Sequence, residues 1–352
     1  MSYFSERYDI ARMRFVASAK KSGCTLWHYP IAAKGHRDEP LSIDVCRMGS
    51  NKATKALVVS SGTHGVEGFF GSAVQLARFK ESKPLPKDVA LIMIHAINPY
   101  GFSHLRRVNE DNIDLNRNFM RIGERHEGAR PGYETFNAML NPQTTPGYFE
   151  FFHIRAMFNI VMHGLPNLKN AIAQGQYDYP KGIFFGGKQA SQSQEILTEH
   201  FHTWMGKAEE IVHLDLHTGL GKKGTYVLGV GGELTPQQDA KWRSVFGKDH
   251  VQHLEPGGEL YEIRGEFGAW CQSHFKDRSY ASFLAEFGTY PILKVIKALC
   301  EENRATHWGK SGQTLNRYRL QLQEVFAPKS PSWREEVLQK GLVLIEQAVN
   351  GL

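Results

Sequence analysis

The stretch VVSSGTHGVEGFFG, residues 58–71, decides the fold of this chain. It leaves an apolar run, turns at glycines, and places His64 three residues before Glu67. The run before the turn suits a buried strand, and the apolar spacing after Gly65 suits a helix. A second apolar run, VALIMIHAIN, occupies residues 89–98. Strand, helix and strand in this order predict a parallel βαβ unit and therefore an α/β fold.

The rest of the chain extends this alternating pattern. Further strands are expected at 41–49, 211–217, 225–230 and 280–288, and the alternation of 41–49 is typical of an edge or half-buried strand. Helices are expected at 5–22, 148–165, 190–207, 266–275, 291–309, 312–326 and 332–349. Neither a repeat nor a linker interrupts the sequence. We therefore expect one domain over 1–352, with a loop-and-helix insertion at about 120–205.

Composition excludes several classes of protein. The chain has 352 residues, of which 41% are hydrophobic, so it can bury a full core. Its four cysteines are widely spaced and form no CxxC pair, which argues against a disulfide framework and a thiolate metal site. The charged N-terminus has no apolar signal region, and no run of about 18 apolar residues exists. These features predict a cytoplasmic protein without a membrane span.

The net charge of +6 is modest, and the charged residues are dispersed along the chain. Dispersed basic residues do not form the contiguous patch that nucleic-acid binding requires. A mild positive charge instead favours a small anionic substrate.

His64 and Glu67 are the first candidate functional pair. An imidazole and a carboxylate spaced this closely after a strand can bind one metal ion, and zinc accepts both donors. The glycines on either side allow the backbone to turn sharply. The alternative is a plain helix N-terminus with a solvated glutamate.

The predicted strand 211–217, IVHLDLH, offers a third ligand. His213, Asp215 and His217 alternate with apolar residues, so all three face one side of a regular strand. His217 ends this strand as His64 follows another, and sites form at the carboxyl ends of parallel strands. Asp215 is then placed to hold the ring of a ligand histidine. The alternative is a buried polar cluster without a metal, and we leave His213 out of the site.

The segment 98–119 is a polar loop that is rich in arginine and asparagine. Guanidinium groups bind carboxylates through paired hydrogen bonds, so this loop is a candidate anion-binding device. The alternative is a solvated surface loop, because its acidic residues nearly balance its arginines.

Glu286 lies within an apolar stretch, SFLAEFG, at the end of a predicted strand. A buried carboxyl has a raised pKa unless it is paired, and a pKa near neutrality suits a general base. The alternative is a structural glutamate paired with an arginine.

Together these segments resemble the zinc carboxypeptidase superfamily, the carboxypeptidase A-like metallocarboxypeptidases. Its motifs occur here in order as His64-Gly-Val-Glu67, Asn98-Pro-Tyr-Gly101, Arg107-Val-Asn109, Asp114-Leu-Asn-Arg-Asn118, His217 and Glu286. The forms T-H-G-x-E and D-L-H also resemble the aspartoacylase and succinylglutamate desuccinylase branch. The resemblance spans residues 62–290 and places the chain in a bacterial group between the two. It implies a three-layer α/β/α fold with a mixed, largely parallel central sheet.

The resemblance also implies a role for each matched residue. His64, Glu67 and His217 would bind one zinc ion per chain, with Asp215 supporting a ligand. Arg107 would stabilise the oxyanion, Asn116 and Arg117 would hold the substrate carboxylate, and Glu286 would act as general base and acid. Tyr226 and Tyr261 are both possible equivalents of the superfamily's mobile tyrosine.

Three functions follow as hypotheses. The first is a metallopeptidase that cleaves an amide bond next to a carboxylate-bearing residue of a small peptide. The second is a deacylase of N-acyl amino acids, which the long 120–205 insertion would favour by narrowing the site. The third is a non-catalytic protein that retains the metal, although the presence of Glu286 argues against it.

Overall fold

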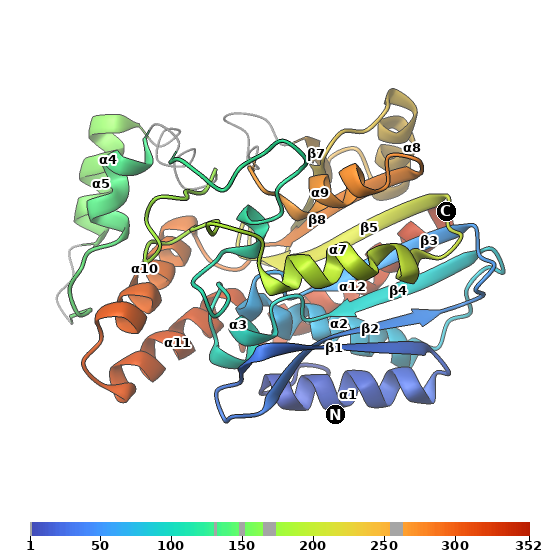
Figure 1. The fold of residues 1–352 in the computed structure, drawn as a ribbon, viewed down its shortest axis with the longest axis horizontal. Helices are drawn as coiled ribbons and strands as arrows, with labels where there is room; N and C mark the ends of the chain where they lie inside the picture. Colours follow the sequence, from blue (N-terminus) through green and yellow to red (C-terminus); the bar gives the residue numbers. More distant parts are fainter. Residues whose placement is uncertain (1, 130–131, 148–151, 165–173, 254–262) are drawn as a thin grey trace.

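The computed structural model describes residues 2–129, 132–147, 152–164, 174–253 and 263–352. Its centre is one eight-stranded sheet in the order β1-β2-β4-β3-β5-β8-β6-β7 (Figure 1). The strands are β1 (Thr25–Lys34), β2 (Pro40–Met48), β3 (Lys55–Ser61), β4 (Val89–His95), β5 (Glu210–Thr218), β6 (Tyr226–Gly231), β7 (Val251–His253) and β8 (Ser279–Phe287).

The middle of the sheet is parallel and its flanks are mixed. β3 pairs in parallel with β4 and β5, and β5 pairs in parallel with β8. β2 is antiparallel to β4, and β6 is antiparallel to β8. The expected α/β fold with a mixed, largely parallel sheet is therefore confirmed.

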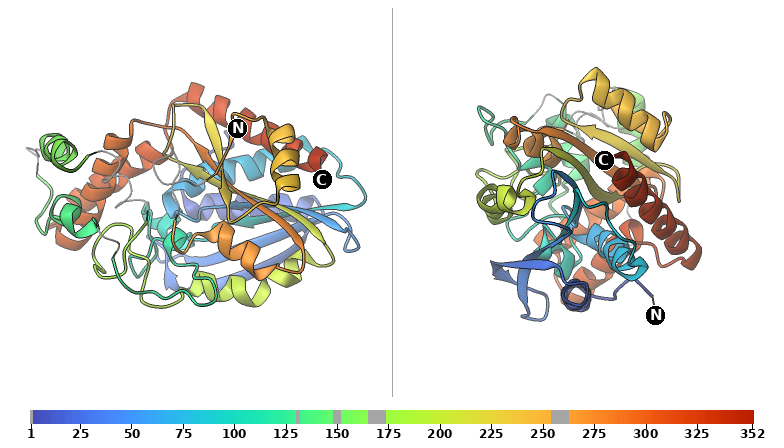
Figure 2. Two further views of the ribbon diagram at one scale, coloured as in Figure 1. Left: turned by 90° about the horizontal axis from the view of Figure 1, so that it is seen from above. Right: turned by 90° about the vertical axis from the view of Figure 1, so that its right-hand side faces the viewer.

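Helices cover both faces of the sheet, which confirms the three layers (Figure 2). One face packs against α1 (Tyr8–Lys21), α2 (Gly68–Glu81), α8 (Pro236–Phe246) and α12 (Pro331–Gly351). The other packs against α7 (Gln192–Met205) and α9 (Phe267–His274). The apolar strand residues fill both interfaces, because each parallel strand is buried on its two sides.

Further helices lie beyond the carboxyl ends of the parallel strands, at the left of Figure 1. They are α3 (Pro99–His104), α4 (Tyr133–Leu140), α5 (Phe152–His163), α10 (Ile292–Trp308) and α11 (Gly312–Phe326). Residues of α4 and α5 share an apolar cluster with α10 and α11. Two short 3-10 turns, at 65–67 and 115–117, complete this end of the molecule.

The structure corrects several local expectations. Strand 41–49 is neither an edge nor half-buried, because β1 covers its outer side and β2 is buried along most of its length. The segment 98–119, expected as a polar loop, begins with the helix α3, whose first turn is capped because Asn98 Oδ1 accepts a hydrogen bond from the Gly101 N–H at 2.8 Å. Helices α4 and α8 and strand β7 were not predicted. A signal for α8 was present, because Thr235 and Gln238 form a capping box at its N-terminus.

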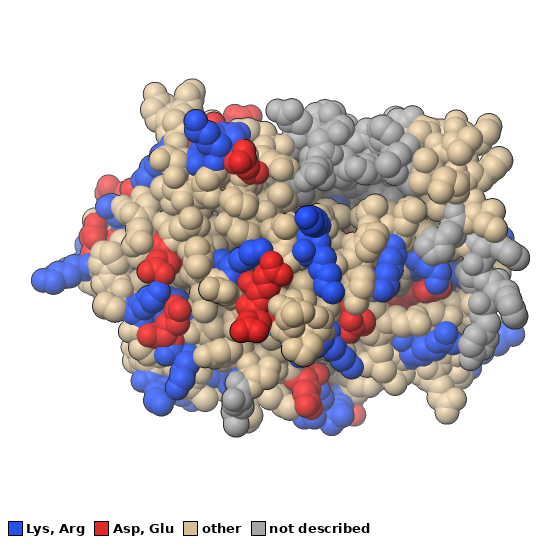
Figure 3. Space-filling view, turned by 180° about the vertical axis from the view of Figure 1, so that it is seen from behind, with Lys and Arg blue, Asp and Glu red and all other residues tan. Residues whose placement is uncertain are grey.

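The apolar character of the helices and the distribution of surface charge bear on the expected partners. Among the described helices, none combines the length and the apolar character that a membrane crossing requires. On the face turned away from the view of Figure 1, lysines and arginines are interspersed with acidic residues (Figure 3).

Candidate metal centre

Three neighbouring strands bring the central side chains together. His64 follows β3, His217 lies near the end of β5, and Glu286 lies near the end of β8. β3, β5 and β8 are parallel neighbours, and His217 pairs directly with Glu286 in the register. The carboxyl ends of these strands therefore deliver all three side chains to one edge of the sheet, as the strand order predicts.

A close backbone contact brings the polar loop to the same edge. A Cβ at Gly65 would lie 2.2 Å from the Gly101 backbone, so only glycine fits at position 65. This approach lets the Gly65 N–H donate to Arg107 O at 3.1 Å, while the Val66 N–H donates to Arg106 O at 2.9 Å. The chain after β3 is thereby joined to the segment that carries Arg107.

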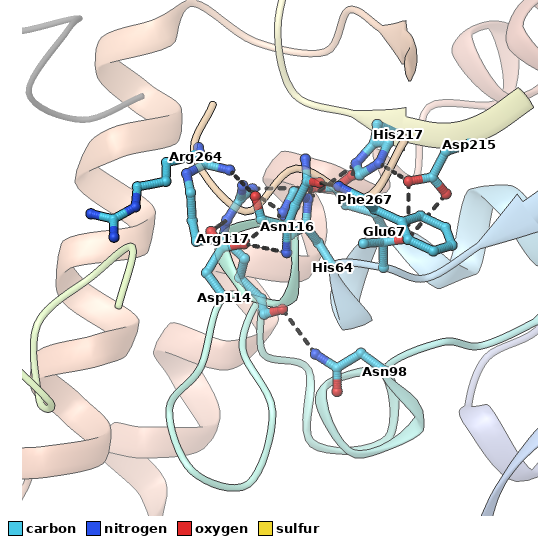
Figure 4. Close-up of polar contacts among 12 residues, drawn as sticks. His64, Glu67, Asn98, Asp114, Asn116, Arg117, Asp215, His217, Arg264 and Phe267 are labelled. Carbon is cyan, nitrogen blue, oxygen red and sulfur yellow. Dashed lines mark hydrogen bonds and ion pairs between the residues drawn. The ribbon is translucent and has the colours of Figure 1, made fainter. Parts of the chain in front are cut away.

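His64, Glu67 and His217 converge on one point (Figure 4). Their ligating atoms all lie within 4.8 Å of one another, and all three side chains are buried. His64 Nδ1 is 2.9 Å from Glu67 Oε1, and His217 Nδ1 is 3.0 Å from Glu67 Oε2. The three donors thus form a buried cluster that could hold a metal ion.

The chemistry of this donor set fits a metal. The two Nδ1 atoms face each other at 3.1 Å beside a carboxylate, so a proton or a metal ion must lie between them. Burial disfavours the charge on Glu67, but His64 and His217 hold its pKa below the usual range. A metal ion would take the place of a proton between the three groups. Two imidazoles and one carboxylate, with a position left for water or substrate, form a donor set typical of catalytic zinc.

Asp215 and the main chain support this cluster from the sheet. Asp215 Oδ2 accepts a hydrogen bond from His217 Nε2 at 2.6 Å, which leaves Nδ1 directed at the cluster. The Thr218 N–H donates to Glu67 Oε2 at 2.9 Å. Asp215 thus lies where it can hold a ligand ring.

On the loop side, Asp114 contacts His64 as Asp215 contacts His217 on the sheet side. No role was predicted for Asp114 from the sequence. Asp114 Oδ1 is 3.0 Å from His64 Nε2, and Asp114 Oδ2 accepts from Arg107 Nε at 2.9 Å. Burial disfavours its charge, but Arg107 and His64 hold the pKa of Asp114 well below the usual range. The signal was its place in the Asp-Leu-Asn-Arg-Asn motif.

Arg107 touches the metal-binding cluster itself. Its Nη1 donates to Glu67 Oε1 at 3.2 Å, and its Nη2 is 2.7 Å from His64 Nε2. The guanidinium therefore lies at the cluster, where it can reach an oxygen of a substrate bound there.

Arg117 is buried, and among the described residues no carboxylate forms an ion pair with it. Its Nη1 donates to Asn116 O at 2.9 Å, and its Nε has no hydrogen-bond partner in the described part of the chain. Asn116 Oδ1 accepts from the Phe267 N–H at 2.9 Å, which ties this turn to α9. A buried cation without a direct ion-pair partner in the described residues is available for an anionic ligand.

Glu286 is buried beside the cluster, and its carboxyl is hydrogen-bonded to the main chain. Its Oε1 accepts from the Leu220 N–H at 2.8 Å. Burial, and then repulsion by Glu67, raise the pKa of Glu286 to about 7. The carboxyl can therefore exchange a proton near neutral pH.

Phe184 was not predicted as a site residue, because it lies in the expected 120–205 insertion, where no site residue was assigned. Its ring lies 5.5 Å from the Arg107 guanidinium and 5.8 Å from that of Arg117. Of the two candidate mobile tyrosines, Tyr261 lies outside the described residues. Tyr226 stacks between His250 and Phe287.

Comparison with solved structures identifies the fold. Bovine thrombin-activatable fibrinolysis inhibitor, solved in complex with tick carboxypeptidase inhibitor, gives a TM-score of 0.55 at 11% identity, over 99% of this chain and 97% of that one. A second structure of thrombin-activatable fibrinolysis inhibitor gives 0.50 at 10% identity, over 100% and 78%. Carboxypeptidase A from Helicoverpa armigera gives 0.48 at 13% identity, over 91% and 75%. The fold is carboxypeptidase-like, as the motifs suggested.

The family follows from the sequence. Residues 4–340 match DUF2817, which is described as a protein of unknown function, and the chain belongs to this family. A search of curated proteins gave no match.

Proposed function

We propose that this chain is a zinc-dependent hydrolase that cleaves an amide bond next to a carboxylate-bearing residue of a small peptide. The observation that carries this proposal is the meeting of His64, Glu67 and His217 beside Glu286, whose pKa is raised to about 7. A metal-binding cluster and a buried base on adjacent strands are the two parts that metal-assisted hydrolysis needs.

Each side chain has a task in this reaction. A bound zinc ion would supply Lewis acidity, which polarises a carbonyl and acidifies water. Glu286 takes a proton from the attacking water and returns it to the leaving amine. Arg107 donates to the oxygen that gains negative charge, and one such donor is worth about 3–4 kcal/mol. Arg117, with Asn116, holds the carboxylate and so orients the substrate.

A second candidate is a deacylase of N-acyl amino acids, which would use the same residues. Phe184 favours it, because its ring lies over both Arg107 and Arg117. An aromatic ring at this position narrows the space around the carboxylate-binding arginine. A narrow site suits a small amide better than a peptide.

The test combines metal analysis with a substrate screen. We expect purified protein to hold one zinc ion per chain, to lose hydrolysis on chelation, and to regain it when zinc is returned. Short peptides with a free carboxylate and N-acyl amino acids are then compared as substrates. Cleavage of peptides supports the first candidate, and cleavage of only N-acyl amino acids supports the second. Protein that neither retains nor rebinds zinc would contradict both.

A further inference from the structure

We propose that Tyr280, His213 and Ser60 are positioning residues, which form a one-directional hydrogen-bond chain that fixes the orientation of Asp215 and, through it, of His217. This inference rests on the proposed function, because it assigns His217 to the metal. It concerns three buried side chains that the reaction described above does not use.

The chain of contacts crosses three adjacent strands. Tyr280 Oη on β8 is 2.9 Å from His213 Nδ1 on β5. His213 Nε2 is 2.7 Å from Ser60 Oγ on β3. Ser60 Oγ is 2.5 Å from Asp215 Oδ1, and Asp215 Oδ2 accepts a hydrogen bond from His217 Nε2 at 2.6 Å. Strand register makes this path possible, because Ser60 pairs with Asp215 between β3 and β5.

Counting hydrogens gives the path one direction. A serine hydroxyl carries a single hydrogen, and Asp215 as a carboxylate can only accept, so Ser60 donates to Asp215. Ser60 must then accept from His213, which places the hydrogen of His213 on Nε2. His213 Nδ1 is left as an acceptor, and the Tyr280 hydroxyl donates to it.

The protonation states agree with this direction. Burial lowers the pKa of His213 to about 4, so the ring is neutral and carries one hydrogen. Burial also raises the pKa of Tyr280 well above its usual value, so the hydroxyl keeps its proton. The three positioning residues and Asp215 are all buried. Because the hydrogen-bond chain does not reach water at Tyr280, it orients the side chains in it and does not carry protons to solvent.

The consequence falls on Asp215. Ser60 binds Oδ1, and Thr63 Oγ1 donates to both carboxylate oxygens at 3.0 Å. The carboxylate therefore cannot rotate without losing partners, and Oδ2 stays directed at His217 Nε2. His217 is thereby held with Nδ1 toward the metal-binding cluster, as an ordered outer shell does for a ligand.

The first experiment uses the metal-free protein, so it does not depend on zinc binding. Nitrogen-15 NMR of the histidine rings should show His213 with its hydrogen on Nε2 and a bare Nδ1 from pH 6 to 8. In Tyr280→Phe, the Nδ1 signal should shift because its donor is gone. A hydrogen on Nδ1 of His213, or a charged His213 in this range, would overturn the proposal.

The second experiment measures zinc affinity in the full chain by competition with a chelator. Replacing a direct partner of a ligand typically costs about 10–100-fold, and His213 and Tyr280 stand further out. We expect His213→Leu and Tyr280→Phe to weaken zinc binding by about 3–10-fold. His213→Gln, which keeps a donor and an acceptor, should recover part of the loss.

His95→Leu is the matched control. His95 is also fully buried and contacts a serine hydroxyl, Ser72 Oγ, at 3.1 Å, but it lies on β4 outside the chain of contacts. It should lower the melting temperature while leaving zinc affinity unchanged. Equal loss of affinity in His95→Leu and His213→Leu would reduce His213 to a packing residue and refute the proposal. Wild-type protein that binds no zinc would contradict the proposed function, while the NMR result would still decide the direction of the chain.

Discussion

The two candidate histidine ligands are supported in opposite ways. His217 is held from the sheet by Asp215, and in the proposed hydrogen-bond chain the hydrogens of Ser60, His213 and His217 Nε2 each have one position. His64 is held from the loop, where its Nε2 faces an acceptor, Asp114, and also a donor, Arg107. The surroundings of His64 therefore do not fix its hydrogen in the metal-free protein.

This difference shows how the site divides its work. The sheet side consists of paired strand residues, which suit a ligand and a base that must be held in fixed positions. The loop side carries charges: the partly buried Arg107 pairs with the buried Asp114, and the buried Arg117 has no direct ion-pair partner among the described residues. Those charges suit a substrate whose carboxylate pairs with Arg117 and whose carbonyl oxygen accepts a hydrogen bond from Arg107.

The largest effect is expected from the base on the sheet side. Glu286→Gln should lower kcat by about 10²–10⁴-fold, because the amide cannot take a proton from water. Zinc content should stay at the wild-type level, since Glu286 is not among the three converging donors. Metal analysis beside steady-state kinetics checks both parts. Loss of zinc in this variant would show that Glu286 is itself a ligand, and would contradict its assignment as a base separate from the metal ligands.

The next effect concerns Arg117, the buried cation on the loop side. Arg117→Ala should raise KM about 10–100-fold for substrates with a free carboxylate, because hydrogen bonds to charged groups are worth about 1.5–3 kcal/mol. The same substrates with the carboxylate converted to an amide serve as the control. If free and amidated substrates suffer equally, Arg117 does not read the carboxylate.

The two supporting carboxylates allow a direct comparison of the sides. Asp114→Asn and Asp215→Asn should each weaken zinc binding by about 10–100-fold. At saturating zinc, Asp114→Asn should also lower kcat, because Arg107 loses the carboxylate that holds its Nε. Asp215→Asn should leave kcat closer to wild type. Identical kinetic losses would show that the loop and the sheet do the same work.

The smallest expected effect is that of pH on kcat/KM near neutrality. Only ionised Glu286 accepts a proton, so kcat/KM should fall as pH drops below its pKa, by about tenfold per unit. The pKa is about 7 without metal, and a nearby cation lowers it, so this limb should lie at or below pH 7. Asp114, whose pKa is held well below the usual range, adds no limb there. A kcat/KM that rises as pH falls from 7 to 5 would contradict the assignment of the base.

The structure of the sheet side could be predicted from the sequence better than that of the loop side. Period-two alternation in 211–217 and the apolar run before His64 are local signals of buried strands. Parallel strands end at the same edge, so the approach of His217 to His64 followed without knowledge of any contact.

The loop side depends on tertiary contacts that leave little local trace. Asp114 serves His64 and Arg107 together only because Gly65 and Gly101 pack backbone to backbone, which no periodicity reports. Phe184 reaches the arginines from a segment without regular spacing. β2 was misjudged for a similar reason, since its burial depends on β1 covering it.

The distance along the chain between the two histidines has a consequence for how the molecule folds. His64 and His217 are 153 residues apart, and Glu286 is later still. Such a long loop is closed late, because its entropy is lost before any distant contact compensates. We therefore expect the metal-binding cluster to form only after the first strands have paired. We expect metal capture to mark the completion of folding instead of nucleating it, so zinc should slow unfolding while leaving the early folding rate unchanged.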